Sequence, residues 1–247
     1  VKLDELPSQI GAPFAGIYDS VADGYVLYLD KSSGELRMKV TAGAAERPGI
    51  PQTMLEKDSW HHVVGVYDGG TVSARIYLDG ELVDVHVNPA LATVPAAQSA
   101  SFGNAGSLDS PFRGMVDETA VWDRPLSEAE VRFLYNQGAG RPVKEQNAVI
   151  GSLTPIVHLP LDGHVRNVGS GGNDLDGLLV DGSLGTSSYV AGKVEKALKL
   201  DNPDRTTGGD VVSIPYEITD IGTVSLWINP TDWYNYQTIF DNSVDAN

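Results

Sequence analysis

The chain has 247 residues, and its 33 Asp and Glu residues outnumber its 17 Lys and Arg residues, which gives a formal net charge of −16. Nucleic acids are bound through clustered Lys and Arg, so this acidic composition indicates no nucleic-acid partner. Cysteine is absent from the sequence, which excludes a disulfide framework, a thiolate nucleophile and a zinc site with cysteine ligands.

Apolar and polar residues alternate along several segments, the pattern of strands with one buried face. The segments are 35–40, 74–78, 83–87, 198–200 and 223–228. Between the second and the third, Asp79-Gly80 predicts a tight hairpin turn. The 27 Gly and 14 Pro residues interrupt these runs at short intervals, which favours an antiparallel sandwich or barrel over alternating strands and helices.

One helix is predicted, over residues 127–135. Ser127 stands three residues before Glu130, the spacing of a capping box, and Gly138 is the expected stop. The polar, aperiodic residues 139–153 are interpreted as a linker. No stretch has the roughly 18 to 20 consecutive apolar residues that cross a bilayer, so we expect no membrane insertion.

The two ends of the chain resemble each other. Ile17-Tyr18-Asp19-Ser20 is similar to Ile239-Phe240-Asp241-Asn242, which indicates two copies of the same part of a repeat. We therefore expect the chain to hold the back of one repeat and the front of the next.

Several segments resemble laminin-G-like domains. Trp60-His61-His62-Val63-Val64-Gly65-Val66-Tyr67-Asp68-Gly69-Gly70, continuing to residue 83, is similar to the centre of that family, and residues 112–135 are similar to its closing strand and C-terminal helix. Residues 157–163, 192–201 and 211–228 resemble its opening strands. The resemblance implies an all-β fold, an antiparallel two-sheet jelly-roll sandwich of the concanavalin A type with one short helix.

The matching segments stand in the reverse order of a laminin-G-like domain. Residues 1–138 are interpreted as the C-terminal part of one repeat and residues 154–247 as the N-terminal part of the next. Two separate half-domains would each expose an apolar sheet face and open edges. We therefore predict one sandwich arranged like a circular permutant, and strand exchange between copies of the chain is the alternative.

The fold that the resemblance implies is also that of bacterial laminarinases and lichenases. These enzymes carry Glu, Asp and Glu at alternate positions of one strand. A retaining glycosidase needs two carboxyls about 5 Å apart, which alternate strand residues provide. No Glu-x-Asp-x-Glu occurs here, and the vicinal pair Asp117-Glu118 has the wrong spacing. The sequence predicts no enzyme of this type, and a divergent glycoside hydrolase built from distant carboxyls stays the alternative.

The resemblance implies a structural calcium ion where the first and last strands meet. The matching positions are Asp117, Asp162, Asp201 and Asn202, and carboxylate and amide oxygens suit this hard cation. The alternative is that Asp162 and Asp201-Asn202 belong to ordinary turns and that Asp117 is a satisfied polar residue. His61 and His62 cannot chelate one ion together, because adjacent strand residues point to opposite faces, and we expect packing or surface roles for them.

A sugar ring binds best where an exposed aromatic face lies beside hydrogen-bonding groups. The densest such cluster is the set Trp233, Tyr234, Asn235 and Tyr236, although a loop of this kind also packs onto the rim of a sandwich. Weaker candidates are Asp19, Asp23, Tyr25, Asp241, Asp245 and Asn247. Trp60, Trp122 and Trp227 lie within alternating segments, where core packing is the usual role.

The sequence therefore predicts a non-catalytic recognition or adhesion module whose partner is a glycan or a cell surface. The chain begins without the basic and apolar regions of a signal peptide, and we expect it to be a segment of a longer multi-repeat protein. An extracellular or cell-surface location is implied by the family resemblance alone. The alternatives are a spacer repeat without a small ligand and the glycoside hydrolase.

Overall fold

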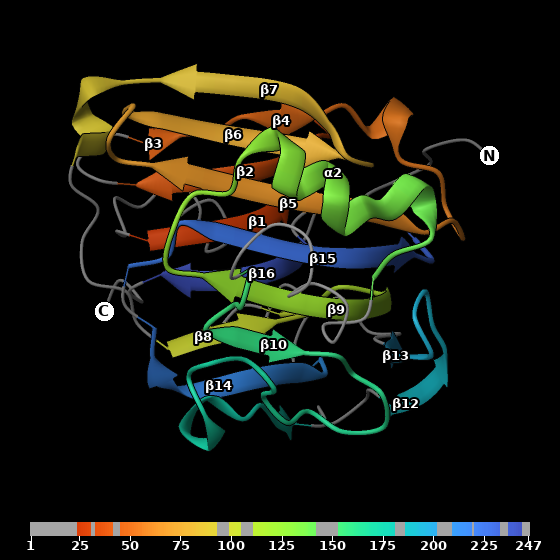
Figure 1. Cartoon of the computed structure of the whole chain (residues 1–247). Coiled ribbons are helices and arrows are strands. Elements are labelled where there is room, and N and C mark those ends of the chain that lie inside the picture. Colours follow the sequence, from red (N-terminus) through yellow and green to blue (C-terminus); the bar gives the residue numbers. More distant parts are fainter. Residues whose placement is uncertain are drawn as a thin grey trace, which may run out of the picture.

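A computed structural model describes residues 24–30, 33–41, 45–92, 99–104, 111–141, 153–180, 186–201, 209–218, 220–232 and 237–243. These residues form two sheets of antiparallel strands that pack face to face (Figure 1). The fold class expected from the sequence, an antiparallel two-sheet sandwich with one short helix, is confirmed.

The first sheet takes its strands from both parts of the chain. Its order is β11 (Leu178–Val180), β14 (Val211–Glu217), β8 (Ser99–Phe102), β16 (Thr238–Ser243), β1 (Gly24–Leu29), β2 (Leu36–Thr41) and β3 (Ala45–Glu46), and β4 (Gly49–Ile50) also pairs with β2.

The second sheet is mixed in the same way. Its order is β12 (Thr186–Ala191), β13 (Lys196–Asp201), β9 (Gly114–Trp122), β15 (Thr223–Pro230), β5 (His61–Asp68), β6 (Ser73–Leu78) and β7 (Glu81–Val87), and β10 (Val157–Leu159) also pairs with β9. Short 3₁₀ turns, η1 (Gln52–Met54), η2 (Pro89–Ala92), η3 (Asn136–Gly138) and η4 (Asn173–Leu175), connect or follow strands.

In each sheet, one strand from the residues after 153 lies between two strands from the residues before 139. β15 lies between β9 and β5, and β16 lies between β1 and β8 (Figure 1). Each sheet would lose an inner strand if either side were removed. The assignment of the two sides to successive repeats stays a prediction.

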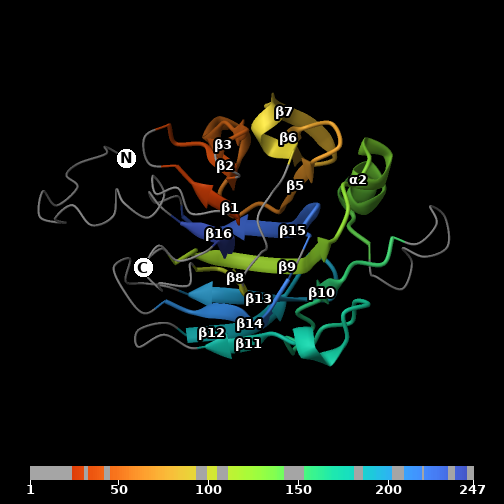
Figure 2. The same ribbon diagram turned by 90° about the vertical axis from the view of Figure 1, so that its left-hand side faces the viewer.

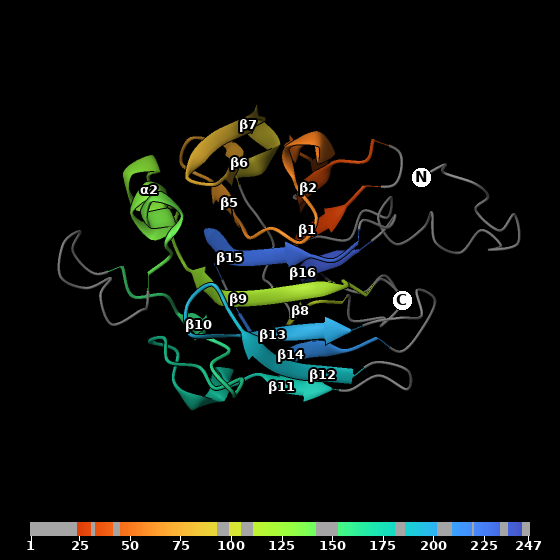
Figure 3. The ribbon, with the colours of Figure 1, turned by 90° about the vertical axis from the view of Figure 1, so that its right-hand side faces the viewer.

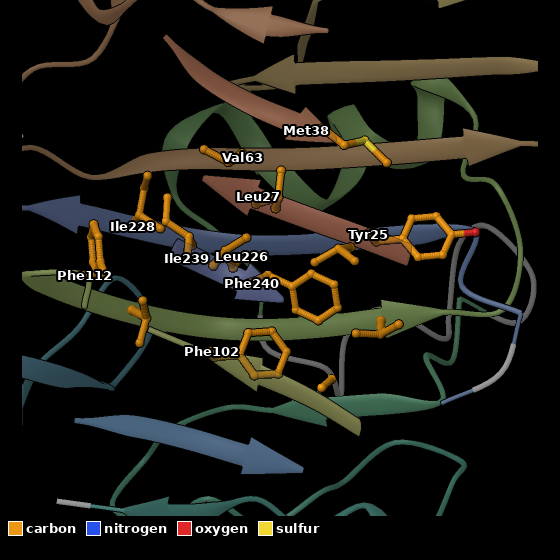
Figure 4. Close-up of a cluster of buried hydrophobic side chains, with 14 of the residues drawn as sticks. Tyr25, Leu27, Met38, Val63, Phe102, Phe112, Leu226, Ile228, Ile239 and Phe240 are labelled. Atoms are coloured by element: carbon orange, nitrogen blue, oxygen red, sulfur yellow. The ribbon is translucent and has the colours of Figure 1, made fainter. Parts of the chain in front are cut away.

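The inward faces of the two sheets form the main hydrophobic core. Side chains such as Leu27 and Phe240 of the first sheet meet Val63 and Leu226 of the second, and all are buried (Figure 4). The rings of Phe102 and Phe240, on neighbouring strands, lie 5.0 Å apart between centroids. The alternation read from the sequence therefore sets which residues enter the core.

A second hydrophobic cluster lies behind the second sheet, where α2 (Glu128–Tyr135) covers the face away from the first sheet (Figures 2 and 3). Val131 and Leu134 of the helix pack there with Trp122. No helix in the described part of the chain is long and apolar enough to cross a membrane.

The predicted helix, over residues 127–135, is confirmed at both limits, and only the residue that stops it is corrected. The Ser127 side chain accepts from the Glu130 N–H, and the Glu130 side chain accepts from the Ser127 N–H, so the capping box is present. The helix ends before Gly138, because Asn136 already takes the left-handed conformation with φ of 50°, which Asn tolerates well.

The Asp79-Gly80 turn is present between β6 and β7, and both residues have positive φ, 50° and 82°, as a two-residue hairpin turn requires. The strand after it departs from expectation. β7 is the last strand of its sheet, and Val85 and Val87 remain 44% and 68% exposed. Alternation in the sequence does not show whether a strand has a neighbour on both sides.

Replacing Leu226 by Ala in β15 should lower the free energy of unfolding by about 2 to 5 kcal/mol, because its side chain is fully buried between the sheets. The loss should appear in a single cooperative transition, measured by chemical denaturation. The matched control is Leu82→Ala on β7, 39% exposed, which should cost about 0.5 kcal/mol or less. Two separate transitions, only one of them shifted by Leu226→Ala, would contradict the interleaved arrangement.

Candidate functional site

An open hollow of about 390 Å³ lies at one end of the sandwich, where β5 and β9 end and β15 begins. This volume is within the range of pockets that hold small molecules. The hollow is lined by Tyr25, Tyr67, Asp68, Gly69, Gly70, Ala92, Asp123, Pro125, Asp220, Ile221 and Gly222.

The wall of the hollow depends on a close backbone approach at Gly222. A Cβ atom at this position would lie 2.2 Å from the backbone carbon of Arg124, so no other residue fits without movement of the backbone. The Gly222 N–H donates to Trp122 O at 2.9 Å, and the Tyr67 N–H donates to Gly222 O at 2.8 Å. These bonds hold the ends of three neighbouring strands together around the hollow.

Two tyrosines form its aromatic side. The rings of Tyr25 and Tyr67 meet edge to face, with centroids 5.7 Å apart, and the Tyr67 hydroxyl donates to Leu91 O at 2.5 Å. The Tyr25 ring belongs to the main core, and its hydroxyl points away from that core (Figure 4).

Tyr25 is only 3% exposed, yet its hydroxyl makes no hydrogen bond within the described residues. Burial, with help from the nearby Tyr67 and Asp220, raises the pKa of Tyr25, so the phenol stays neutral and can both donate and accept. The Tyr25 oxygen is not among the fully buried polar atoms that lack a partner in the described chain, so the hydroxyl end of this otherwise buried side chain opens onto the hollow. This hydroxyl lines the hollow and is placed to bond a ligand there.

Three carboxylates surround the hollow. Asp68 already accepts from the N–H groups of Gly70 and Thr71, at 2.9 and 3.2 Å, and from the Thr71 hydroxyl at 2.7 Å. Partial burial favours a higher pKa for Asp68, but these hydrogen bonds and Arg75 outweigh it and hold the pKa below its usual value. Within the described chain, Asp123 and Asp220 are exposed and take part in no hydrogen bond or ion pair, so their oxygens are free for a ligand.

The structure brings two of the predicted calcium ligands to one turn, between β12 and β13. Asp117 Oδ2 accepts from the N–H groups of Lys193 and Val194 at 2.8 and 2.9 Å, and Asp162 Oδ1 accepts from the Lys196 N–H at 2.8 Å. Asp117 Oδ1 also accepts from the Glu118 N–H at 2.8 Å. Both residues therefore act as acceptors that hold this turn, which is the alternative role considered from the sequence.

Asp201 lies away from that turn. Asp117 in β9 is next to Val116, the register partner of Leu198 in β13, and Asp201 follows at the far end of β13, so the two carboxylates are separated by about 13 Å along the strand direction. Asp201 instead lies 3.5 Å from Arg113 Nε. Asn202 lies outside the described residues.

The described members of the predicted calcium set thus do not form one site. In the part of the chain that the structure describes, no three His, Asp or Glu side chains are grouped so that they could hold a metal ion. Calcium binding stays a prediction, and the described residues provide no set of ligands for the ion in this geometry.

A buried polar pair lies beside Asp117. Glu118 has φ of 48° at a β-bulge in β9, and its Oε2 lies 2.7 Å from His158 Nε2. Burial raises the pKa of both Asp117 and Glu118 to about 8, although backbone N–H groups oppose the rise at Asp117. Burial lowers the pKa of His158 to about 3. These groups are almost fully buried and have no access to a substrate.

The two adjacent histidines have the structural roles expected for them. His61 Nδ1 lies 3.1 Å from Asp79 Oδ2, and His62 Nε2 lies 2.9 Å from Ser225 Oγ. His62 also packs on Trp227, with ring centroids 5.0 Å apart. Trp122 and Trp227 are buried, in agreement with the packing role predicted for them.

The predicted sugar-binding residues Trp233, Tyr234, Asn235 and Tyr236 lie outside the described residues, so this prediction stays untested. Of the weaker candidates, Tyr25 lines the hollow. Sequence reasoning missed Tyr67, Asp68, Asp123 and Asp220 as parts of one site. Asp220 precedes the predicted strand 223–228, and Asp123 lies in the segment that resembles the closing strand of the family, but nothing in the sequence shows that these strand ends meet beside Asp68.

Two antiparallel sheets packed face to face are the architecture of a jelly-roll β-sandwich. In agreement, a laminin G-type family model, described as the concanavalin A-like lectin/glucanases superfamily, matches residues 1–132, more than half of the chain. The chain belongs to this family, as its sequence resemblance indicated. No curated protein and no solved structure matches the chain.

The buried carboxyls predict a pH dependence of stability. Because the folded-state pKa of Asp117 and of Glu118 is raised to about 8, their contribution to stability is complete at acidic pH and is lost as the pH rises through 8. His158 and His62, with pKa values lowered to about 3 and 4, contribute fully above about pH 6.5. From pH 6.5 to 8.5 the free energy of unfolding should therefore fall, by up to about 1.4 kcal/mol per pH unit for each proton released.

Glu118→Gln should reduce this fall, measured by urea denaturation at the two pH values, because the amide does not ionise. The matched control is Glu217→Gln, which removes the same charge from an exposed position and should leave the fall unchanged. An equal fall in wild type and Glu118→Gln, with Asp117→Asn also without effect, would contradict the raised pKa values.

Proposed function

We propose that this protein is a non-catalytic recognition module that binds a glycan in the hollow at the end of the sandwich. The observation that carries the proposal is the Tyr25 hydroxyl, which ends an otherwise buried side chain, lacks a partner within the described residues and opens onto the hollow. Membership of a family of lectins and glucanases supports a carbohydrate as the ligand class.

The chemistry of the hollow suits a sugar. The partly exposed ring of Tyr67 offers apolar surface to the CH groups of a pyranose, and free carboxylates accept hydrogen bonds from its hydroxyls. Asp123 and Asp220 lie at the same edge of the second sheet, since one follows β9, the other precedes β15, and these strands are antiparallel neighbours. A small number of polar groups in an aromatic hollow is the usual composition of a small-molecule site.

The absence of catalysis is part of the proposal. A glycosidase needs a carboxylic acid with a raised pKa beside the scissile bond. The carboxyls whose pKa is raised to about 8 are Asp117 and Glu118, and both are buried away from the hollow. Asp68, which does line it, is held ionised by its hydrogen bonds.

An extracellular or cell-surface location and a role in adhesion complete the proposal, and they rest on the family. The rival is a spacer repeat that binds no small ligand. Asp123, Asp220 and the Tyr25 hydroxyl favour recognition, because these hydrogen-bonding groups line one hollow and have no partners in the described chain.

The test is a glycan array with neutral, acidic and amino sugars, followed by calorimetric titration of the best ligand. Tyr25→Phe should weaken binding by about 5- to 10-fold, the effect of one lost hydrogen bond. Its melting temperature should be close to that of wild type, because the hydroxyl that the variant removes opens onto the hollow and has no partner in the described structure.

Tyr216→Phe is the matched control, since this tyrosine is 58% exposed and outside the hollow, and it should leave affinity unchanged.

Trp233→Ala tests the site expected from the sequence. Loss of binding in Trp233→Ala but not in Tyr25→Phe would move the site away from the hollow. No saturable binding, with and without calcium, would favour the spacer, and release of reducing ends from β-glucans would favour the hydrolase.

A further inference from the structure

We infer that the hollow selects a sugar that carries a protonated amine, an amino sugar of the glucosamine type, over neutral and acidic sugars. This inference rests on the proposed function and specifies its ligand class. It depends on the charge around the hollow, on the spacing of its carboxylates and on the Tyr25 hydroxyl.

The charge around the hollow is of one sign. Asp68, Asp123 and Asp220 contribute three carboxylates, and no Lys, Arg or His is among the described residues that line it. Arg75 Nη2 lies 3.5 Å from Asp68 Oδ2 and offsets part of one charge. The two carboxylates without ion pairs, Asp123 and Asp220, create a negative potential that attracts a cation and repels a carboxylate or sulfate.

The three carboxylates are not grouped as ligands of one metal ion. No grouping of three acidic or histidine side chains suited to an ion occurs among the described residues, these three included. A ligand that satisfies them must carry several donors on a frame of some size. A sugar with one ammonium group and several hydroxyls carries its donors on such a frame. A flexible side chain with a single ammonium group reaches only some of the carboxylates.

The Tyr25 hydroxyl is the independent sign of a ligand. Tyr25 is 3% exposed, its only polar side-chain atom faces the hollow, and it has no partner within the described residues. Its neighbour Tyr67 differs, since that hydroxyl donates to Leu91 O. A sugar hydroxyl or ring oxygen beside Tyr25 would complete the hydrogen bonding of this phenol.

The rings add selectivity for a cation. An ammonium group near the face of a tyrosine is attracted by the quadrupole of the ring, and a charge-assisted hydrogen bond to a carboxylate is about twice as strong as a neutral one. Replacing the amine by an N-acetyl group removes both contributions while it keeps the sugar ring. The pair of glucosamine and N-acetylglucosamine oligomers therefore isolates the charge.

The experiment is calorimetric titration of the purified chain with tetramers of glucosamine, N-acetylglucosamine and glucose, in a buffer in which the sugar amine is protonated. The glucosamine tetramer should bind about tenfold tighter than either neutral tetramer, the difference expected for charge-assisted bonds. Added salt should reduce that difference. Asp123→Asn and Asp220→Asn should each weaken glucosamine binding severalfold and weaken binding of the glucose tetramer much less, because the amide oxygen still accepts hydrogen bonds from sugar hydroxyls.

Asp174→Asn, in the exposed turn η4, is the control for the overall negative charge of the chain and should have no effect. Equal affinity for all three tetramers would overturn the inference and leave the proposed function in place. An effect of Asp174→Asn as large as that of Asp123→Asn would overturn it as well, since attraction would then be non-specific. Tetralysine binding as tight as that of the glucosamine tetramer would overturn the inference that the ligand is a sugar. No binding of any probe would reject both proposals.

Discussion

The central position of β15 is the constraint on which the rest of the structure depends. It is hydrogen-bonded to β9 on one side and to β5 on the other, and every one of its residues is buried. One face enters the core between the sheets through Val224, Leu226 and Ile228. On the other face Trp227 stacks on Tyr135 of α2, with ring centroids 5.7 Å apart. A strand from residues 154–247 therefore organises strands and a helix from residues 1–138.

The hollow is a consequence of the same placement. The residues before β15, Asp220 to Gly222, form one of its walls, and the backbone of Gly222 bonds to both neighbouring strands. Because these bonds fix the strand ends, the side chains of Tyr67, Asp68 and Asp123 are held around one space by a rigid scaffold. Binding residues on loops supported by such a scaffold are a common arrangement. The fold supplies the position, and the side chains at the strand ends supply the chemistry.

The buried polar residues show how the seam between the two parts is stabilised. Asp117 of β9 holds the turn between β12 and β13, and Glu118 of the same bulge reaches His158 of β10. Both contacts join segments far apart in the sequence. Burying these carboxyls costs free energy, which the backbone hydrogen bonds to Asp117 partly offset. The pair Asp117 and Glu118 therefore has a structural role in this geometry, since it joins β9 to the β12–β13 turn and to β10.

The sequence by itself determined the fold class, the family, the hairpin turn at Asp79-Gly80 and the capped start of α2, because alternation, turn chemistry and capping are local properties of the chain. It did not determine which strands are neighbours. The exposed valines of β7, the separation of Asp201 from Asp117 and the meeting of Tyr25, Asp123 and Asp220 all depend on the order of strands in the sheets. That order is decided by which apolar faces fill the core together, and this is a property of the tertiary structure alone.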